Sequence, residues 1–194
     1  MGTMTLAVSR HGHACVRIER AGRALVVDPG VWSDLTVLDD AEVVLVTHEH
    51  PDHLALDALV ARATAGLPVR APGPVVAALE AAGAPADALR TVASGDELDA
   101  AGLRVRVLGE RHVVIHPDLP VPANVAYLVE DLVLHPGDSY TPPPAGTAVD
   151  LLLQPLGAPW LRLGEAADYV RAVGPRRVVP IHDALLSDLG RGER

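Results

Sequence analysis

Hydrophobic residues along this chain fall into short runs bounded by glycine, proline and charged positions. Runs rich in Val, Leu and Ile predict strands at 6–9, 15–20, 24–28, 43–47, 89–108, 125–134, 150–154 and 177–181. Gly22 lies between the second and third of these runs, which indicates a hairpin. The fourth run begins with four consecutive apolar residues, and its length and β-branching are typical of a buried strand.

Three other segments repeat apolar residues at helical spacing. The first begins at Leu56 and stops before Gly66, the second opens at Pro74 and stops before Gly83, and the third ends at Gly174. Two β-rich halves that each carry helices fit an α/β (α+β) fold in which two packed sheets lie between helices, a four-layer αββα sandwich. Neither an internal repeat nor an interdomain linker is evident, so we expect one domain over 1–194.

The seven residues 47–53, Thr-His-Glu-His-Pro-Asp-His, directly follow the buried run. His48 and His50 are two residues apart, so in extended backbone their side chains share a face and can bind one ion. Asp52 and His53 come after a proline that redirects the chain, and they can face a second ion roughly 3.5–4 Å away. Burying these groups without a partner is costly, and one or two divalent metal ions would satisfy all of them.

Further candidate ligands follow three more strand-like runs. The segments are Gly109-Glu110-Arg111-His112, His135-Pro136-Gly137-Asp138 and Ile181-His182-Asp183. Loops at strand ends on a rigid sheet are where functional groups tend to lie. Two ions with four to five ligands each need more donors than residues 47–53 supply, so these segments are candidates to complete the site.

Together these segments resemble the metallo-β-lactamase superfamily of hydrolases. Its H-x-H-x-D-H motif and its three later ligand positions are matched, in chain order, by His48, His50, Asp52, His53, His112, Asp138 and His182. Two shorter motifs, Gly12-His13-Ala14 and His135-Pro136-Gly137-Asp138, resemble the branch that contains ascorbate-6-phosphate lactonase-like and related uncharacterised hydrolases. The likeness extends roughly from Leu6 to Leu186.

The resemblance implies the metallo-β-lactamase fold and a site for two divalent metal ions. One ion would be bound by His48, His50 and His112, the other by Asp52, His53 and His182, and Asp138 would bridge the two. The implied nucleophile is a bridging water, whose pKa a bound ion can lower from 15.7 to about 7, and Asp52 would also orient it. The histidine-rich ligand set suits Zn²⁺, and imidazole with carboxylate also admits Mn²⁺ or Fe.

The sequence allows two roles for several side chains near these ligands. The resemblance implies that Asp28 supports the metal-binding loop by contacts rather than as a ligand. His116 is either an alternative to His112 as metal ligand or a residue of the pocket. We expect His135 to support its loop, as metal-bound groups usually need such partners. His13 and Trp160 either line the pocket or pack structurally. Arg111 could hold a substrate anion or form a surface ion pair; Tyr140 and Arg162 are weaker candidates.

Composition and charge narrow the classes of partner. The 194 residues carry a formal net charge of −9, and all basic side chains are arginine. An acidic surface argues against nonspecific nucleic-acid binding and against an anionic membrane surface. The absence of lysine removes Schiff-base chemistry and a Walker-type phosphate loop. One cysteine, Cys15, suits a reducing compartment, and no run resembles a signal or a membrane span, so we expect a cytoplasmic location.

The sequence therefore predicts a dinuclear metal-dependent hydrolase that acts on a small-molecule ester, lactone, amide or phosphodiester. Three alternatives use the same scaffold: an iron-dependent oxidoreductase or dioxygenase, a nuclease, and a non-catalytic metal sensor. The full sets of ligands for both ions and the lack of an attached flavin domain argue against the first, and acidic charge argues against the second. Asp52 and Asp138 argue against the third. No apolar stripe marks an interface, so a homo-oligomer is left open.

Overall fold

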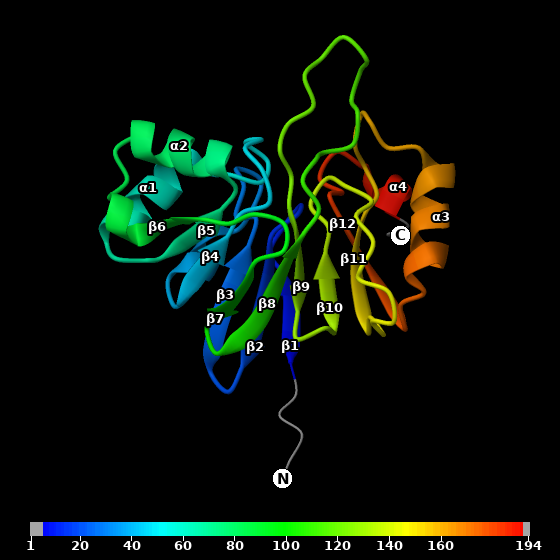
Figure 1. Cartoon of the computed structure of the whole chain (residues 1–194). Coiled ribbons are helices and arrows are strands. Elements are labelled where there is room, and N and C mark those ends of the chain that lie inside the picture. Colours follow the sequence, from blue (N-terminus) through cyan, green and yellow to red (C-terminus); the bar gives the residue numbers. More distant parts are fainter. Residues whose placement is uncertain (1–5, 192–194) are drawn as a thin grey trace.

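Two six-stranded sheets pack face to face in the computed structural model, which describes residues 6–191 (Figure 1). The first sheet has the order β1 (Ala7–Arg10), β2 (Val16–Arg20), β3 (Arg23–Val27), β4 (Val43–Leu45), β5 (Val69–Ala71) and β6 (Leu89–Thr91). The second has the order β12 (Arg177–Ile181), β11 (Leu151–Pro155), β10 (Val133–His135), β9 (Ala126–Val129), β8 (Leu103–Leu108) and β7 (Glu97–Ala100).

Helices cover the outer face of each sheet, as Figure 1 shows. On the first sheet lie α1 (Leu56–Thr64) and α2 (Gly73–Ala81), and on the second lies α3 (Leu163–Val173). Shorter elements are α4 (Asp188–Arg191) and the 3-10 helices Leu35–Leu38 and Ala86–Ala88. The four-layer αββα architecture is confirmed. Among the described residues, no helix has the length and hydrophobicity needed to cross a membrane.

Three apolar clusters correspond to the three interfaces between layers. The largest lies between the sheets and contains fully buried side chains from both, such as Ile18, Leu25, Val105 and Leu153. A second cluster joins α1 and α2 to the first sheet, and the third joins α3 to the second sheet. Tyr127 is fully buried between the sheets, where its hydroxyl donates to the Val46 carbonyl oxygen at 2.9 Å. This bond ties β9 to the chain leaving β4.

Local sequence explains most of the elements. Ala21 and Gly22 have φ angles of 55° and 79°, the two positive values of a tight hairpin turn, which confirms the predicted hairpin. Helices α1, α2 and α3 begin and end close to their predicted limits, and Gly174 caps α3 with φ 59°. The predicted β regions at 89–108 and 125–134 contain three and two strands, respectively, with turns between them.

Candidate metal centre

The H-x-H-x-D-H segment leaves the sheet directly after β4. His48 and His53 are fully buried, whereas His50 and Asp52 are partly exposed. His48 Nε2 lies 3.0 Å from His50 Nδ1, so the two rings present nitrogen atoms to the same point, as the spacing predicted. The segment lies against Gly30, where an added Cβ would come within 1.8 Å of the Asp52 carbonyl oxygen. Only glycine allows this close approach.

Asp28 holds the H-x-H-x-D-H segment in place through hydrogen bonds. It follows β3 and is fully buried, and its carboxylate accepts hydrogen bonds from the Thr47 amide and the Thr47 hydroxyl, both at 2.7 Å. Its Oδ2 also lies 2.7 Å from His53 Nδ1. Thr47 was not predicted to have a role at the site, yet its hydroxyl connects Asp28 to His48, whose Nδ1 lies 3.0 Å from it. One carboxylate therefore orients two inward-facing imidazoles.

Asp138 lies at the centre of the histidines, in the loop after β10. Its Oδ1 is 3.2 Å from His53 Nε2, and its Oδ2 is 3.2 Å from both His112 Nε2 and His182 Nε2. Trp160 Nε1 donates to Oδ2 at 3.1 Å. The two carboxylate oxygens thus face different histidines, which is the arrangement that a bridging ligand requires.

The inward-facing atoms form two groups, each small enough to enclose one ion. His48, His50, His112 and Asp138 make one group, and His13, Asp52, His53 and His182 make the other. Within each group the candidate ligand atoms all lie within 4.8 Å of one another. The structure therefore brings together all seven residues predicted as metal ligands and adds His13.

Three buried atoms at this centre have no hydrogen-bond partner among the described residues: His53 Nε2, His182 Nε2 and Asp138 Oδ1. Buried polar atoms are normally satisfied, so a group of unsatisfied lone pairs aimed at one another needs an explanation. Imidazole nitrogen and carboxylate oxygen together are a ligand set suited to zinc, manganese or iron. The residues present therefore fit divalent metal ions.

Hydrogen bonds made by the other ring nitrogen assign the ligand atom of four histidines. His112 Nδ1 donates to the Val113 carbonyl oxygen at 2.5 Å, and His182 Nδ1 donates to that of Gly157 at 2.9 Å. His48 and His53 use Nδ1 toward Thr47 and Asp28, as described above. In the neutral form, each of these rings would direct an Nε2 lone pair into the centre, as metal-bound histidines do.

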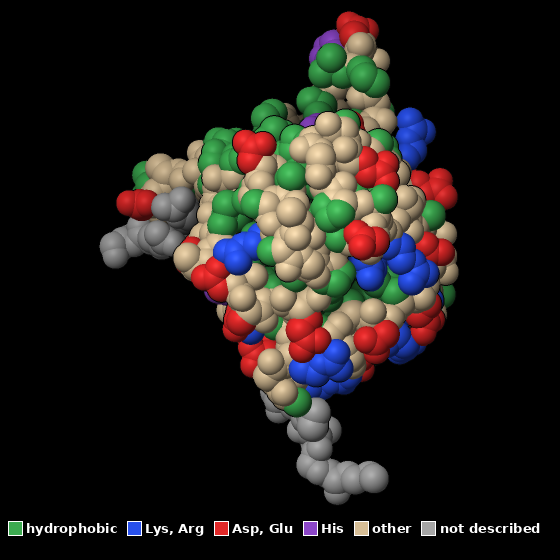
Figure 2. Space-filling model, turned by 90° about the vertical axis from the view of Figure 1, so that its left-hand side faces the viewer, with side chains coloured by type: hydrophobic (Ala, Val, Ile, Leu, Met, Phe, Trp, Pro, Cys, Tyr) green, Lys and Arg blue, Asp and Glu red, His purple; other side chains and the backbone are tan. Residues whose placement is uncertain are grey.

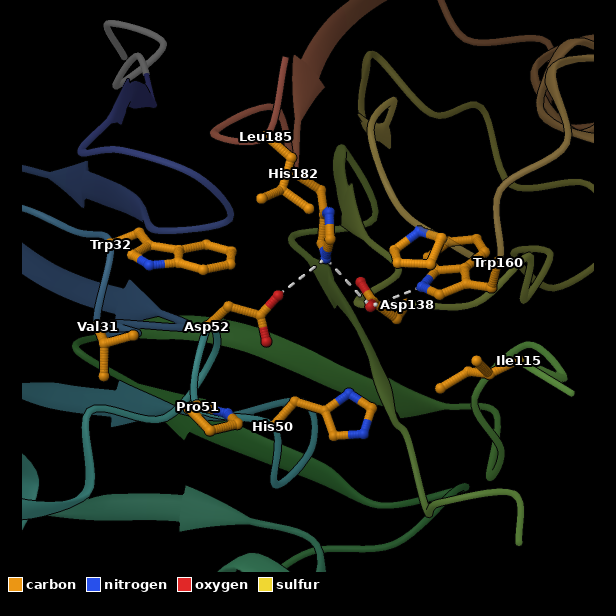
Figure 3. A pocket seen from close by; sticks show the side chains of 11 residues that line it. Val31, Trp32, His50, Pro51, Asp52, Ile115, Asp138, Trp160, His182 and Leu185 are labelled. Carbon is orange, nitrogen blue, oxygen red and sulfur yellow. Dashed lines mark hydrogen bonds and ion pairs between the residues drawn. The ribbon is translucent and has the colours of Figure 1, made fainter. Parts of the chain in front are cut away.

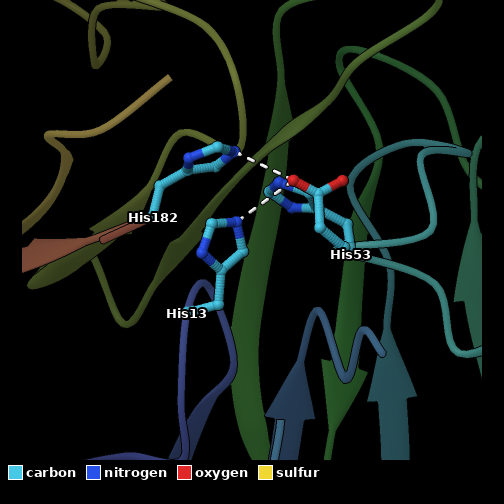
Figure 4. A group of neighbouring side chains, drawn as sticks. His13, His53 and His182 are labelled. Atoms are coloured by element: carbon cyan, nitrogen blue, oxygen red, sulfur yellow. Dashed lines mark hydrogen bonds and ion pairs between the residues drawn. The ribbon is translucent and has the colours of Figure 1, made fainter. Parts of the chain in front are cut away.

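His13 has the opposite tautomer. The Ala184 amide donates to His13 Nδ1 at 3.2 Å, so a neutral ring carries its proton on Nε2. That Nε2 lies 3.1 Å from Asp52 Oδ2, on which His182 Nε2 also converges at 3.2 Å (Figure 4). Burial lowers the pKa of His13, which keeps it neutral. His13 thus orients Asp52 by donating a hydrogen bond.

His135 is placed beside the centre but faces away from it. Its Nε2 donates to the Ala14 carbonyl oxygen at 2.9 Å, and its Nδ1 accepts from the Gly137 amide at 3.2 Å. Both ring nitrogens are therefore used in holding the Asp138 loop to the turn before β2. Asn124, which the sequence did not single out, fixes the same loop because its Oδ1 accepts from the Asp138 amide at 3.0 Å.

Charge at the centre is divided between carboxylates and two imidazoles. Burial opposes protonation of His53, but Asp138 and Asp28 outweigh it and raise the pKa of His53 well above its usual value. Burial also opposes protonation of His182, but the neighbouring carboxylates of Asp138 and Asp52, each 3.2 Å from its Nε2, raise its pKa to about 9. The carboxylates therefore attract positive charge, and metal ions would displace these protons.

Backbone strain is concentrated at the same residues. His13, Asp28 and His182 have φ angles of 40°, 52° and 57°, in the left-handed region that non-glycine residues rarely adopt. The other described non-glycine residues with positive φ lie in turns between adjacent antiparallel strands: Ala21, Ala101, Glu130 and Asp131. Strain outside such turns persists where the surrounding structure over-determines it, and it often marks functional sites.

A pocket of about 310 Å³ opens onto the centre (Figure 3). It is lined by Val31, Trp32, His50, Pro51, Asp52, Ile115, Asp138, Pro159, Trp160, His182 and Leu185. Trp160 is one of these lining residues, and its side chain is also largely buried. His116 and Arg111 do not line it; both are exposed on or near the segment between β8 and β9 that projects above the sheets in Figure 1.

Comparison with known proteins gives consistent matches. Residues 7–182 match the family model described as a beta-lactamase superfamily domain. The chain is 38% identical over 193 residues to Protein Rv0786c of Mycobacterium tuberculosis, covering 96% of this chain and 88% of the relative. It is 32% identical over 183 residues to UPF0173 protein PF0020 of Pyrococcus furiosus, covering 91% and 83%.

Solved structures share the fold at lower identity. Igni18, a metallo hydrolase from Ignicoccus hospitalis, matches with a TM-score of 0.67 and 23% identity over 91% of this chain and 82% of its own. CmlA, a diiron beta-hydroxylase from Streptomyces venezuelae, matches with a TM-score of 0.65 and 18% identity, covering 95% of this chain and 46% of its own.

Proposed function

The chain belongs to the beta-lactamase superfamily domain family, and we propose that it is a dinuclear metal-dependent hydrolase acting on a small molecule. The observation that carries the proposal is the pair of four-residue donor groups around Asp138, whose two oxygens face different histidines. Zinc suits this ligand set, and manganese or iron is compatible with it. Igni18, which shares the fold at 23% identity, is described as a metallo hydrolase, and this likeness carries the fold alone.

The two groups of candidate ligand atoms divide the roles among the residues. His48, His50 and His112 would hold one ion, and Asp52, His53 and His182 the other. Asp138 would contact both, because its two oxygens face histidines of both groups. When bound, such ions acidify water and polarise the scissile bond. Asp52 is positioned by the Nε2 proton of His13, and it is the partly exposed carboxylate that faces the pocket. Asp52 can therefore orient a water molecule and accept its proton.

An iron-dependent oxygenase is the second candidate, because CmlA has the same fold and is a diiron enzyme. Its identity to this chain is 18%, so the likeness carries the fold alone. Both candidates use the same ligand groups and differ in the reaction. Oxygen consumption by iron-loaded protein would indicate the oxygenase, and hydrolysis without oxygen consumption would indicate the hydrolase.

Reconstitution of metal-free protein tests the proposed function. Chelator-treated protein is expected to hydrolyse no ester, lactone, amide or phosphodiester, and added Zn²⁺, Mn²⁺ or Fe²⁺ should restore hydrolysis of at least one class. Loss of activity with the chelator and recovery with a metal would support a metal-dependent hydrolase. Equal activity with and without metal would contradict it, as would iron-dependent oxygen consumption without any hydrolysis.

The His13→Ala variant separates a positioning residue from a metal ligand. Because His13 donates to Asp52, we expect the variant to keep its metal content while kcat falls about 10–100-fold, as for other partners of metal ligands. Elemental mass spectrometry and steady-state kinetics provide the two measurements. If metal content fell by about one ion per chain, His13 would be a ligand and its assigned tautomer would be wrong.

The His116→Ala variant is the matched control. His116 is exposed on the projecting segment, and its Nδ1 accepts from the Asp118 amide at 3.2 Å. We expect unchanged metal content and unfolding free energy within about 0.5 kcal/mol of the wild type. Loss of a metal ion from this variant would mean that His116, and not His112, completes the first ligand group.

A further inference from the structure

The pocket above the metal centre has an apolar wall and a polar floor. The wall consists of Val31, Trp32, Pro51, Ile115, Pro159, Trp160 and Leu185, and the polar lining residues are four of the proposed metal-centre residues, His50, Asp52, Asp138 and His182. In Figure 3, Trp32 and Val31 lie on one side of the opening and Ile115 and Trp160 on the other. A ligand would thus contact apolar side chains everywhere except at its reacting group.

Among the described residues, no arginine lines this pocket, and the chain has no lysine. Arg10, near the C-terminal loop, is paired with Asp183 at 2.6 Å, and Arg162 is paired with Glu165 at 3.1 Å. Arginine usually provides the bidentate partner of a phosphate or carboxylate group. The pocket therefore offers an anionic substituent of the substrate no counter-charge beyond the metal centre.

Apolar surface continues beyond the pocket toward α1. A groove of about 550 Å³ shares Val31 and Pro51 with the pocket. Its other apolar lining residues are Leu35, Leu54, Ala55, Leu56, Ala58 and Ala78. Figure 2 shows the face over α1 and α2, where arginine side chains lie mostly in the lower half and hydrophobic ones gather beneath the projecting segment. An extended apolar chain could follow this surface away from the metal centre.

The residues at the mouth are unusually exposed for their type. Val31 is 53% exposed, Trp32 47% and Leu185 57%, and Val114 and Leu119 on the projecting segment are similarly exposed. Contiguous exposed apolar side chains commonly mark a binding site. Their continuity with the metal centre indicates that the occupant is a substrate.

We propose that the substrate is an uncharged carboxylic ester or lactone with an apolar acyl chain. Its carbonyl group would lie above Asp52, Asp138 and His182, and its chain would extend past Val31 and Trp32. In the reaction, the oxygen of water bonds to the carbonyl carbon and the acyl–oxygen bond breaks. The alcohol leaves with one proton of the water, and the carboxylic acid releases the other. This inference rests on the proposed function and excludes phosphodiesters as the preferred class.

Tryptophan fluorescence measures binding directly, because both tryptophans of the chain line the pocket. Metal-free protein titrated with n-alkanols from butanol to octanol is expected to bind each longer alcohol about two- to four-fold more tightly per methylene, near the limit set by burial of a CH₂ group. Hexyl phosphate should bind more weakly than hexanol. Affinity independent of chain length, or tighter binding of hexyl phosphate, would overturn the inference.

Two variants test whether the dependence of affinity on chain length arises in this pocket. Ile115→Ser removes an apolar wall residue and should flatten the dependence on chain length, whereas Leu132→Ser, at an exposed turn between β9 and β10, should not. An equal loss in both variants, or in neither, would contradict binding in this pocket.

Kinetics of the metal-loaded enzyme separate this inference from the proposed function. With p-nitrophenyl esters from acetate to octanoate, kcat/KM is expected to rise with chain length and to exceed that for bis(p-nitrophenyl) phosphate. Ester hydrolysis that is independent of chain length would overturn only the assigned substrate class. Hydrolysis of the phosphodiester in preference to every ester would do the same. Hydrolysis of no substrate in any metal form would overturn the proposed function.

Discussion

Replacing Asp138 with alanine is expected to abolish metal binding at both ligand groups and hydrolysis together. Its two oxygens each lie 3.2 Å from inward-facing imidazole nitrogens, and together they reach His53, His112 and His182. Loss of a partner that only supports a ligand costs about 10–100-fold in metal affinity or activity, and loss of a shared ligand should exceed this. Elemental mass spectrometry and hydrolysis rates on the same sample test the expectation.

Folding must be verified in the Asp138→Ala variant. The hydrogen bonds that hold its loop run through the backbone amide of residue 138 to Asn124 and through His135, and both remain possible without the carboxylate. A thermal unfolding curve of the metal-free variant should therefore resemble that of the metal-free wild type. Full activity in a folded variant would contradict the bridging role.

Replacing Asp28 with alanine is expected to lower the free energy of unfolding by about 3–5 kcal/mol, because one partner of a buried charged pair is removed. The Thr47 amide, the Thr47 hydroxyl and His53 would all lose the acceptor they now share. Alanine also fits the φ of 52° at this position less well than aspartate does. Chemical denaturation of metal-free protein measures the difference.

Two further variants distinguish the buried, hydrogen-bonded carboxylate of Asp28 from an ordinary surface carboxylate. Asp28→Asn keeps one acceptor oxygen and tolerates a positive φ, so it should lose less stability than the alanine variant while still binding metal more weakly. Asp168→Ala removes an exposed partner of Arg171 and should change the unfolding free energy by about 0.5 kcal/mol or less. If Asp28→Ala were equally mild, the buried network around Thr47 would not support the metal loop.

Features encoded in one continuous segment could be predicted from the sequence. The H-x-H-x-D-H turn, the hairpin at Gly22 and the amphipathic helices each depend on neighbouring residues, and the structure places all of these elements close to their predicted limits. The strand β5 was not predicted, because three residues between the helices α1 and α2 carry too little periodicity to be recognised. Its position is set by pairing with β4 and β6.

Features that depend on distant segments could not be predicted. His13 reaches Asp52 only because the turn between β1 and β2 packs against the loop after β12, where the Ala184 amide fixes its tautomer. Trp32 was not predicted as a site residue, because a lone aromatic residue in a loop carries no pattern. In the structure, its ring packs edge-on against His13, with the two ring centroids 4.9 Å apart. The apolar wall likewise combines residues from several loops, none of which is distinctive alone.

Metal content per chain tests the central claim most directly. Protein purified without added metal is analysed by elemental mass spectrometry, with the Asp138→Ala variant beside it. The two ligand groups predict about two equivalents of zinc, manganese or iron in the wild type and a loss of both in the variant. Wild-type protein that binds no more than one equivalent, even after dialysis against excess Zn²⁺, Mn²⁺ or Fe²⁺, would contradict a dinuclear centre.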